Sequence, residues 1–91
     1  MKIEHRPELS RFEHASGGDL AVCEYRREGS AWILTHTFVP ESMRGTGVAA
    51  ALVKTTLEHI RAEGGRVVPA CSYVAAYIQR HPDYASLLKT P

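Results

Sequence analysis

The fold of this chain is decided by the stretch from 36 to 49, His36-Thr37-Phe38-Val39-Pro40-Glu41-Ser42-Met43-Arg44-Gly45-Thr46-Gly47-Val48-Ala49. It completes a β-branched and aromatic run over 31–39, which predicts a strand that stops at Pro40. An amphipathic run follows the glycines, so the expected order is strand, glycine-rich turn, helix. Glycines let a backbone approach a ligand closely, and a helix N-terminus presents free N–H groups and a partial positive charge. The stretch therefore predicts an anion site, most often one for phosphate or pyrophosphate.

Two common phosphate motifs are excluded at this turn. No Gly-Lys-Ser/Thr follows the glycines, so the turn is not a Walker loop. The dinucleotide fingerprint Gly-x-Gly-x-x-Gly would need a third glycine where Ala50 stands. The turn must therefore belong to another class of phosphate-binding motif.

The rest of the chain predicts an α/β fold of the α+β kind with a mixed sheet. Turn signals at 16–19 and 27–30 separate the strands of an N-terminal antiparallel meander. Gly64-Gly65 is expected to end the first helix. Strand, helix and strand over 31–70 form a βαβ unit, whose two strands should be parallel. Strands are expected at 2–6, 11–15, 20–27, 31–39 and 66–70, and helices at about 45–63 and 73–81, with one further turn at 83–88.

Length and composition predict one small domain over residues 1–91. The chain has a formal net charge of +1, which gives no electrostatic case for nucleic acid or an acidic membrane surface. A weaker idea, nucleic-acid binding through Arg6, Arg11, Arg26 and Arg27, meets the same objection. No apolar run is long enough to cross a bilayer, and the N-terminus lacks the apolar region of a secretory signal. Two scattered cysteines do not suggest a disulfide scaffold, so we expect a reduced, cytoplasmic chain. No His/Cys pair has metal-ligand spacing, so we expect no metal site. We expect a monomer or a weak homodimer.

The turn resembles the Arg/Gln-x-x-Gly-x-Gly/Ala signature of the GNAT N-acetyltransferase superfamily, with Arg44, Gly47 and Ala49 in the three signature positions. The stretches 67–74 and 80–84 resemble the minimal, single-domain YjdJ-like branch of that superfamily. The resemblance implies acetyl-CoA as donor and an amine, small or on a protein, as acceptor. It also implies that the turn amides hold the CoA pyrophosphate and that the strand end pairs with the pantetheine arm. The residues so implicated are Phe38, Val39, Met43, Arg44, Gly45, Thr46, Gly47, Val48 and Ala49.

Three further side chains are candidates for catalysis. His36 lies near the end of one parallel strand, and Cys71 lies just past the other, at a helix N-terminus that favours a thiolate. His36 could take the proton of Cys71 or of the amine, so attack on the thioester could be direct or could pass through an acetyl-Cys71. Tyr77 resembles the tyrosine that donates a proton to the leaving sulfur in the family, and the Val39 amide could donate to the carbonyl oxygen.

Two functions of different class follow from these residues. The first is an acetyltransferase that moves an acetyl group from acetyl-CoA to an amine. The second is a non-catalytic module that binds CoA or acetyl-CoA. Both need the turn at 44–49, and only the first needs chemistry from Cys71, His36 or Tyr77.

Overall fold

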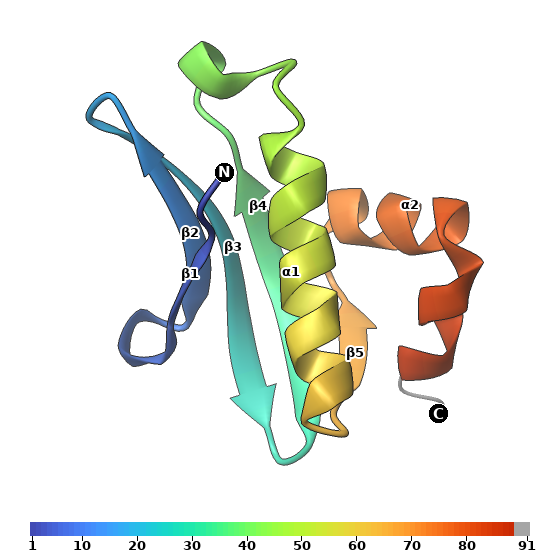
Figure 1. Ribbon diagram of the computed structural model, residues 1–91. Coiled ribbons are helices and arrows are strands. Elements are labelled where there is room, and N and C mark those ends of the chain that lie inside the picture. The colour runs from blue at the N-terminus through green and yellow to red at the C-terminus, as the bar shows by residue number, and fades with distance from the viewer. Residues whose placement is uncertain (89–91) are drawn as a thin grey trace.

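The computed structural model describes residues 1–88, so residues 89–91 of the expected domain lie outside the described part. Five strands and two α-helices make up the fold (Figure 1). The strands are β1 (Glu4–Arg6), β2 (Arg11–Ser16), β3 (Asp19–Glu28), β4 (Ala31–Phe38) and β5 (Arg66–Pro69). The helices are α1 (Val48–Ala62) and α2 (Ser72–Arg80), with short 3-10 helices at Pro7–Leu9, Glu41–Met43 and Pro82–Leu87.

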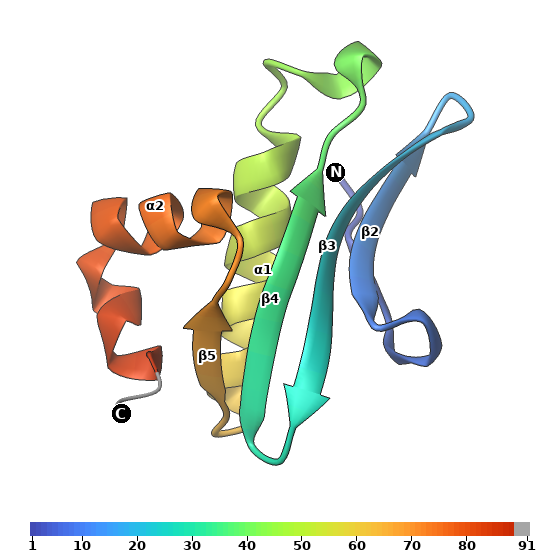
Figure 2. The ribbon, with the colours of Figure 1, turned by 180° about the vertical axis from the view of Figure 1, so that it is seen from behind.

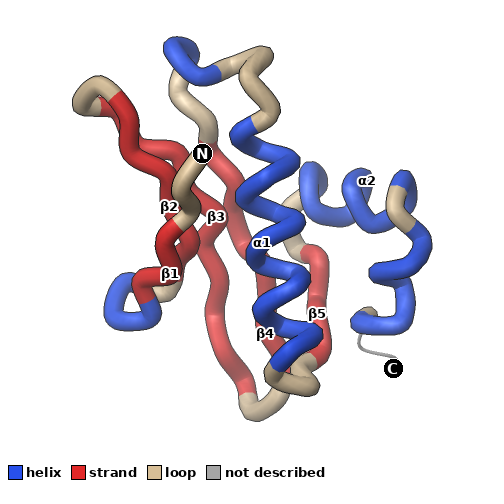
Figure 3. The backbone as a smooth tube through the Cα atoms, viewed as in Figure 1, coloured by secondary structure: helices blue, strands red, loops and turns tan. Residues whose placement is uncertain are grey.

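The strands form one mixed sheet in the order β1-β2-β3-β4-β5. Neighbours from β1 to β4 are antiparallel, and β5 runs parallel to β4. The α1 helix connects these two parallel strands across one face of the sheet, as the tube in Figure 3 shows. The predicted meander, βαβ unit and mixed α+β fold are therefore confirmed, with element ends that differ by a few residues.

The core lies between the sheet and α1. The apolar stripe of α1 includes Leu52, Val53, Leu57 and Ile60, all with no exposed surface, because these residues recur at helical spacing on one side of the helix. The strands contribute inward side chains, among them Phe12, Ala21, Cys23, Tyr25, Trp32 and Leu34. Figure 2 shows the other face of β3 and β4 with no helix of the described chain in front of it.

One glycine permits close packing at the C-terminal end of α1. A Cβ on Gly65 would lie 2.8 Å from Nε1 of Trp32, so any side chain there would push against the indole. The connection from α1 to β5 can therefore pass directly over the buried Trp32 only because residue 65 is glycine.

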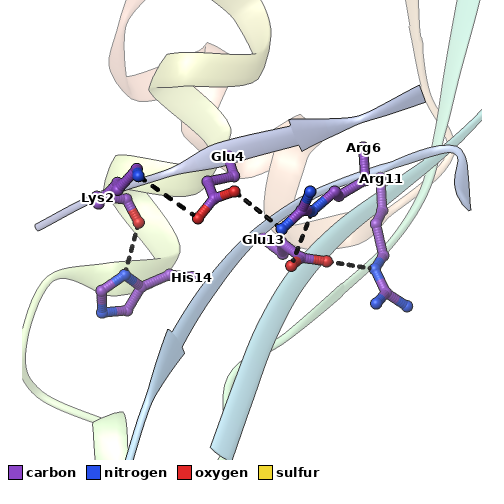
Figure 4. Close-up of polar contacts among 6 residues, drawn as sticks. All are labelled: Lys2, Glu4, Arg6, Arg11, Glu13 and His14. Atoms are coloured by element: carbon purple, nitrogen blue, oxygen red, sulfur yellow. Dashed lines mark hydrogen bonds and ion pairs between the residues drawn. The ribbon is translucent and has the colours of Figure 1, made fainter. Parts of the chain in front are cut away.

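Charged side chains hold the β1–β2 edge together (Figure 4). The Glu13 carboxylate accepts hydrogen bonds from Nε of Arg11 at 2.8 Å and Nε of Arg6 at 3.3 Å, and Arg6 also pairs with Glu4 at 2.9 Å. The hydrogen bond from Arg11 lowers the pKa of Glu13. Partial burial raises this pKa, but the hydrogen bond from Arg6 also lowers it, so the pKa lies below its ordinary value. The edge strand β1 is short and charged, which protects the open edge of the sheet from pairing with other chains.

Candidate functional site

The glycine turn between β4 and α1 is built by two left-handed glycines. Gly45 has a φ of +79° and Gly47 a φ of +85°, a region that residues with a Cβ rarely adopt. Met43, which is buried, anchors the turn to the core, and its carbonyl accepts hydrogen bonds from the hydroxyl and the N–H of Thr46. The helix expected from residue 45 therefore begins only at Val48, because Gly45 and Gly47 are not helical.

The start of α1 leaves donors free for a ligand. No side chain caps the helix, and the N–H of Ala51 makes the first bond of the helix to the carbonyl of Gly47, at 3.0 Å. The earlier N–H groups of the first turn consequently have no intrahelical acceptor. A cavity of about 250 Å³ opens at this point and is lined by Val39, Met43, Arg44, Gly45, Gly47, Val48, Ala49, Ala50 and Tyr73. This geometry suits an anionic group, as at other helix N-termini.

Arg44 adds positive charge beside this cavity. Its Nε donates to the carbonyl of Val39 at 3.3 Å, which ties the start of the turn to the end of β4. The rest of its guanidinium is exposed and carries further N–H donors. Seven of the nine residues implicated by the sequence line the cavity, and Phe38 and Thr46 do not.

The parallel strands separate next to the turn. Their pairing ends at Leu34 and Pro69, whereas β4 continues to Phe38. The last backbone-to-backbone hydrogen bond between the two segments runs from the N–H of Cys71 to the carbonyl of Leu34, at 2.9 Å. Beyond this point one edge of β4 has no strand neighbour among residues 1–88, so its backbone groups can pair with an extended ligand.

A bulge at the end of β4 decides where its side chains point. Glu24 of β3 pairs with His36, but the next residue, Tyr25, pairs with Leu34, so Thr35 is the extra residue. Thr37 lies opposite the buried Cys23 and so shares its inward face. His36 lies opposite Glu24, on the outer face, and is exposed.

Cys71 therefore meets Thr37 rather than His36. Its Sγ lies 3.5 Å from Oγ1 of Thr37, and among residues 1–88 Cys71 makes no hydrogen bond with His36. The expected proton transfer from Cys71 to His36 lacks the hydrogen bond that it would need. The physical reason is the bulge, which turns the side chain of His36 to the outer face of the sheet and that of Thr37 to the inner face.

The surroundings of Cys71 favour its thiolate. Burial alone would raise the pKa of this thiol, but hydrogen bonding from Thr37 and the N–H groups of Val74 and Tyr73 outweighs burial and lowers the pKa below its ordinary value. Cys71 is the N-cap residue of α2, although it makes no cap hydrogen bond of normal geometry. Its sulfur thus lies at the positive end of a helix dipole.

Two tyrosines of α2 lie near this region. Tyr77 is almost fully buried, its ring stacks on His81 with centroids 4.0 Å apart, and burial followed by nearby Tyr73 and acidic side chains raises its pKa. Tyr73 is 37% exposed and lines the turn cavity, which Tyr77 does not. Sequence reasoning missed Tyr73 and Thr37. Tyr73 could have been found from the sequence, because it lies in the first turn of the helix that follows Cys71. The inward position of Thr37 could not, because it depends on the bulge.

Other features of the described residues set limits on the site. Residues 1–88 contain no group of three or more His, Cys, Asp or Glu side chains placed to hold a metal ion. None of the described helices has the length and hydropathy needed to span a bilayer. A larger apolar cavity of about 540 Å³ lies between α2 and the segment Pro82–Leu87, away from the turn.

Known proteins resemble this chain over nearly its whole length. A family model described as GCN5-related N-acetyl-transferase matches residues 11–87. The protein NATD1 of Mus musculus is 31% identical over 85 residues, which cover 90% of this chain and 77% of that protein. NATD1 of Danio rerio is 29% identical over 89 residues, which cover 92% of this chain and 81% of that protein.

A solved structure has the same fold. The solution structure of a GCN5-like protein from Staphylococcus aureus superposes with a TM-score of 0.75, over 99% of this chain and 89% of the other, at 22% sequence identity. At that identity the likeness supports the fold alone, whereas the family model covers the turn, the bulge and Cys71 together. The chain belongs to the GCN5-related N-acetyltransferase family.

Proposed function

We propose that this chain binds acetyl-CoA at the turn of residues 44–49 and transfers its acetyl group to an amine. The observation that carries the proposal is the uncapped start of α1, where two left-handed glycines and Arg44 surround a cavity beside the open edge of β4. Free N–H groups and a guanidinium suit the pyrophosphate of CoA, and the open edge suits an extended pantetheine arm. Membership of the family supports the same donor.

The placement of side chains around the end of β4 divides the chemistry between two faces of the sheet. Cys71 and Thr37 lie on the inner side, near the point where the parallel strands separate. His36 lies on the outer face, which no helix of the described chain covers (Figure 2). An amine that approached from this open face would meet His36 first, and His36 would take its proton as general base.

In the direct reaction the amine nitrogen forms a bond to the thioester carbonyl carbon, and the carbon–sulfur bond breaks. The amine proton passes to His36 or to water, and the CoA thiolate takes a proton from a tyrosine of α2, either Tyr73 or Tyr77. In the covalent variant the Cys71 thiolate attacks the thioester carbonyl and displaces the CoA thiolate. The amine then attacks acetyl-Cys71, gives up its proton to His36 or to water, and releases the Cys71 thiolate. The pKa-lowering contacts of Cys71 support the capacity for the second route, and the open face around His36 supports the first.

The test is turnover with a panel of acceptors. The chain is incubated with acetyl-CoA and a polyamine, a lysine peptide or a peptide with a free N-terminus, and acetylated amine and released CoA are both quantified by mass spectrometry. The expected result is equal amounts of the two products with at least one acceptor, and their joint loss in Gly47→Ala. Saturable CoA binding without acetylation of any acceptor would overturn transfer and leave the non-catalytic binding module.

A further inference from the structure

Two histidines meet edge to face at the end of the domain that lies away from the glycine turn. His5 of β1 and His59 in the last turn of α1 have ring centroids 4.6 Å apart, with an angle of 64° between the ring planes. The ring of His5 lies flat on that of Phe12, with centroids 4.1 Å apart. His59 also meets Phe12 and Trp32 edge to face, at 5.4 and 5.5 Å. The two imidazoles therefore connect the edge strand to the helix over an aromatic part of the core.

The strand β1 is held to the sheet on one side only. It pairs with β2 over three residues, and no other strand among residues 1–88 pairs with it. Side chains alternate along a strand, so His5 faces α1 while Glu4 and Arg6 lie on the outer face. Ile3, directly before the strand, adds a partly buried apolar side chain. The imidazole of His5 is thus the side chain of β1 that meets the helix.

The hydrogen bonding of His5 suits a neutral imidazole. Its Nε2 lies 2.6 Å from the hydroxyl oxygen of Tyr25. Burial raises the pKa of Tyr25, so the hydroxyl keeps its proton and can donate it to an unprotonated Nε2. A protonated Nε2 would itself donate, and the Tyr25 hydroxyl makes no other hydrogen bond among residues 1–88. Protonation of His5 therefore leaves the Tyr25 hydrogen without an acceptor within the described chain.

The charged groups around His5 act in both directions, and those that oppose protonation prevail. Burial is the largest cause that lowers the pKa of His5, and His59 is the next. Glu63 on α1 and Glu8 in the 3-10 helix after β1 raise this pKa, whereas Arg27 on β3 lowers it. The Glu63 carboxylate lies 2.6 Å from Nε2 of His59, as an ion-pair contact without hydrogen-bond geometry. The pKa of His5 in the closed structure consequently lies below its ordinary value.

We propose that β1 is an acid-released edge strand. The neutral ring of His5 holds the strand against α1, and uptake of a proton by His5 favours its detachment while α1 and the strands β2 to β5 stay folded. Detachment uncovers the ring of Phe12, which is only 2% exposed in the closed structure, together with the backbone edge of β2. An apolar ring and an unpaired strand edge together form a surface that pairs readily with another extended segment.

The sign of the pH dependence follows from the lowered pKa. In the detached strand His5 takes up a proton near its ordinary pKa of about 6.5, and in the closed strand only at a lower pH. The opening equilibrium constant therefore rises as the pH falls through about 6.5, by up to about tenfold per pH unit, and levels off below the closed-state pKa. The ion pairs of Arg6 with Glu4 and Glu13 do not depend on His5, so they limit how far the strand opens.

The test is native-state hydrogen exchange of the full chain, followed by NMR between about pH 8 and about pH 5, across the ordinary histidine pKa. Each amide rate is divided into the intrinsic rate at the same pH, which gives a protection factor free of the chemistry of exchange. We expect the protection of the β1 amides at 4–6 to fall with pH in the native chain. The amides at 52–57, in the middle of α1, should keep their protection, because they exchange only on global unfolding.

Three variants separate the histidine pair from other titrating groups. His5→Phe keeps a ring on Phe12 without a titrating group, so its β1 protection should not change over this range. His59→Gln should show a smaller fall than the native chain, because the closed-state pKa of His5 then lies nearer its ordinary value. His14→Gln is the control, since His14 lies on β2 and bonds through Nδ1 to the Lys2 carbonyl at 2.8 Å (Figure 4). It should behave as the native chain does.

Three results would overturn the proposal. The first is a native β1 whose protection is independent of pH, and the second is an equal fall of protection in His5→Phe. The third is a parallel loss at 4–6 and 52–57 in the native chain, which would mean that acid unfolds the whole domain rather than detaching one strand. If His5→Phe failed to fold, the smaller fall expected in His59→Gln would decide, and a fall equal to the native one would count against the pair.

Discussion

Gly47→Ala separates the two roles of the glycine turn, its backbone conformation and its ligand site. A Cβ at residue 47 would meet no atom within 4 Å, so the substitution adds no clash within the chain. Its cost comes from holding alanine at a φ of +85°, about 1 to 2 kcal/mol for a residue with a Cβ in the left-handed region. For a domain of this size each kcal/mol lowers the melting temperature by about 4 to 8 °C.

The effect on CoA binding should exceed this loss of stability. Gly47 lines the cavity proposed for the pyrophosphate, and relief of the strain would turn the N–H groups of the first helical turn away from it. Loss of one charge-assisted hydrogen bond weakens binding by about tenfold or more. We therefore expect a folded variant with a dissociation constant for CoA at least about tenfold above the native value.

Gly64→Ala is the matched control for this experiment. Gly64 has a φ of +71°, its Cβ would also meet no atom within 4 Å, and it follows the opposite end of α1. The helix of 15 residues that separates the two glycines is about 22 Å long. Thermal unfolding should show similar losses for both variants, and calorimetry should show weaker CoA binding for Gly47→Ala alone. The reasoning would be refuted if folded Gly47→Ala bound CoA as the native chain does, or if Gly64→Ala lost as much affinity.

Three further predictions concern Cys71 and the charged edge. With acetyl-CoA, the covalent route predicts a hydroxylamine-labile gain of one acetyl group in intact mass that Cys71→Ala abolishes, and the absence of any adduct in the native chain during turnover would favour direct attack. Thr37→Val should raise the pH at which Cys71 reaches half its maximal alkylation rate by iodoacetamide, because the variant loses the hydroxyl that lowers the thiol pKa, and an unchanged midpoint would contradict that contact. Glu13→Gln should cost up to about 1 kcal/mol of unfolding free energy in urea at neutral pH. Because the folded-state pKa of Glu13 is lowered, this stabilisation is present above the ordinary glutamate pKa, and the difference from native should vanish as the pH falls through the folded value.

The sequence predicts the order and type of elements well because each has a strong local signal. The apolar period of α1, the double glycine after it and the Gly17-Gly18 turn between β2 and β3 are all local, and each appears where it was expected. The exact start of α1 was wrong by three residues, since glycine can either enter a helix or precede it. Only the structure shows that Gly45 and Gly47 are left-handed.

The relation between His36 and Cys71 could not be predicted in the same way. A regular strand would place His36 on the inner face with Trp32 and Leu34, and the bulge at Thr35 reverses that alternation. The bulge arises from pairing with β3, which no feature of 31–39 announces. Thr37 takes the place beside Cys71 that the sequence suggested for His36. Bulges commonly re-aim side chains next to active sites, so the error falls at the site itself.

Acetyl-CoA titration followed by amide shifts in two-dimensional nitrogen–proton NMR tests the central claim most directly. We expect saturable shifts that are largest for the turn amides at 45–50, together with the end of β4 at 36–39 and the start of α2 at 71–73. Shifts confined to the apolar cavity between α2 and Pro82–Leu87, or no saturable shift at all, would contradict a donor site at the glycine turn.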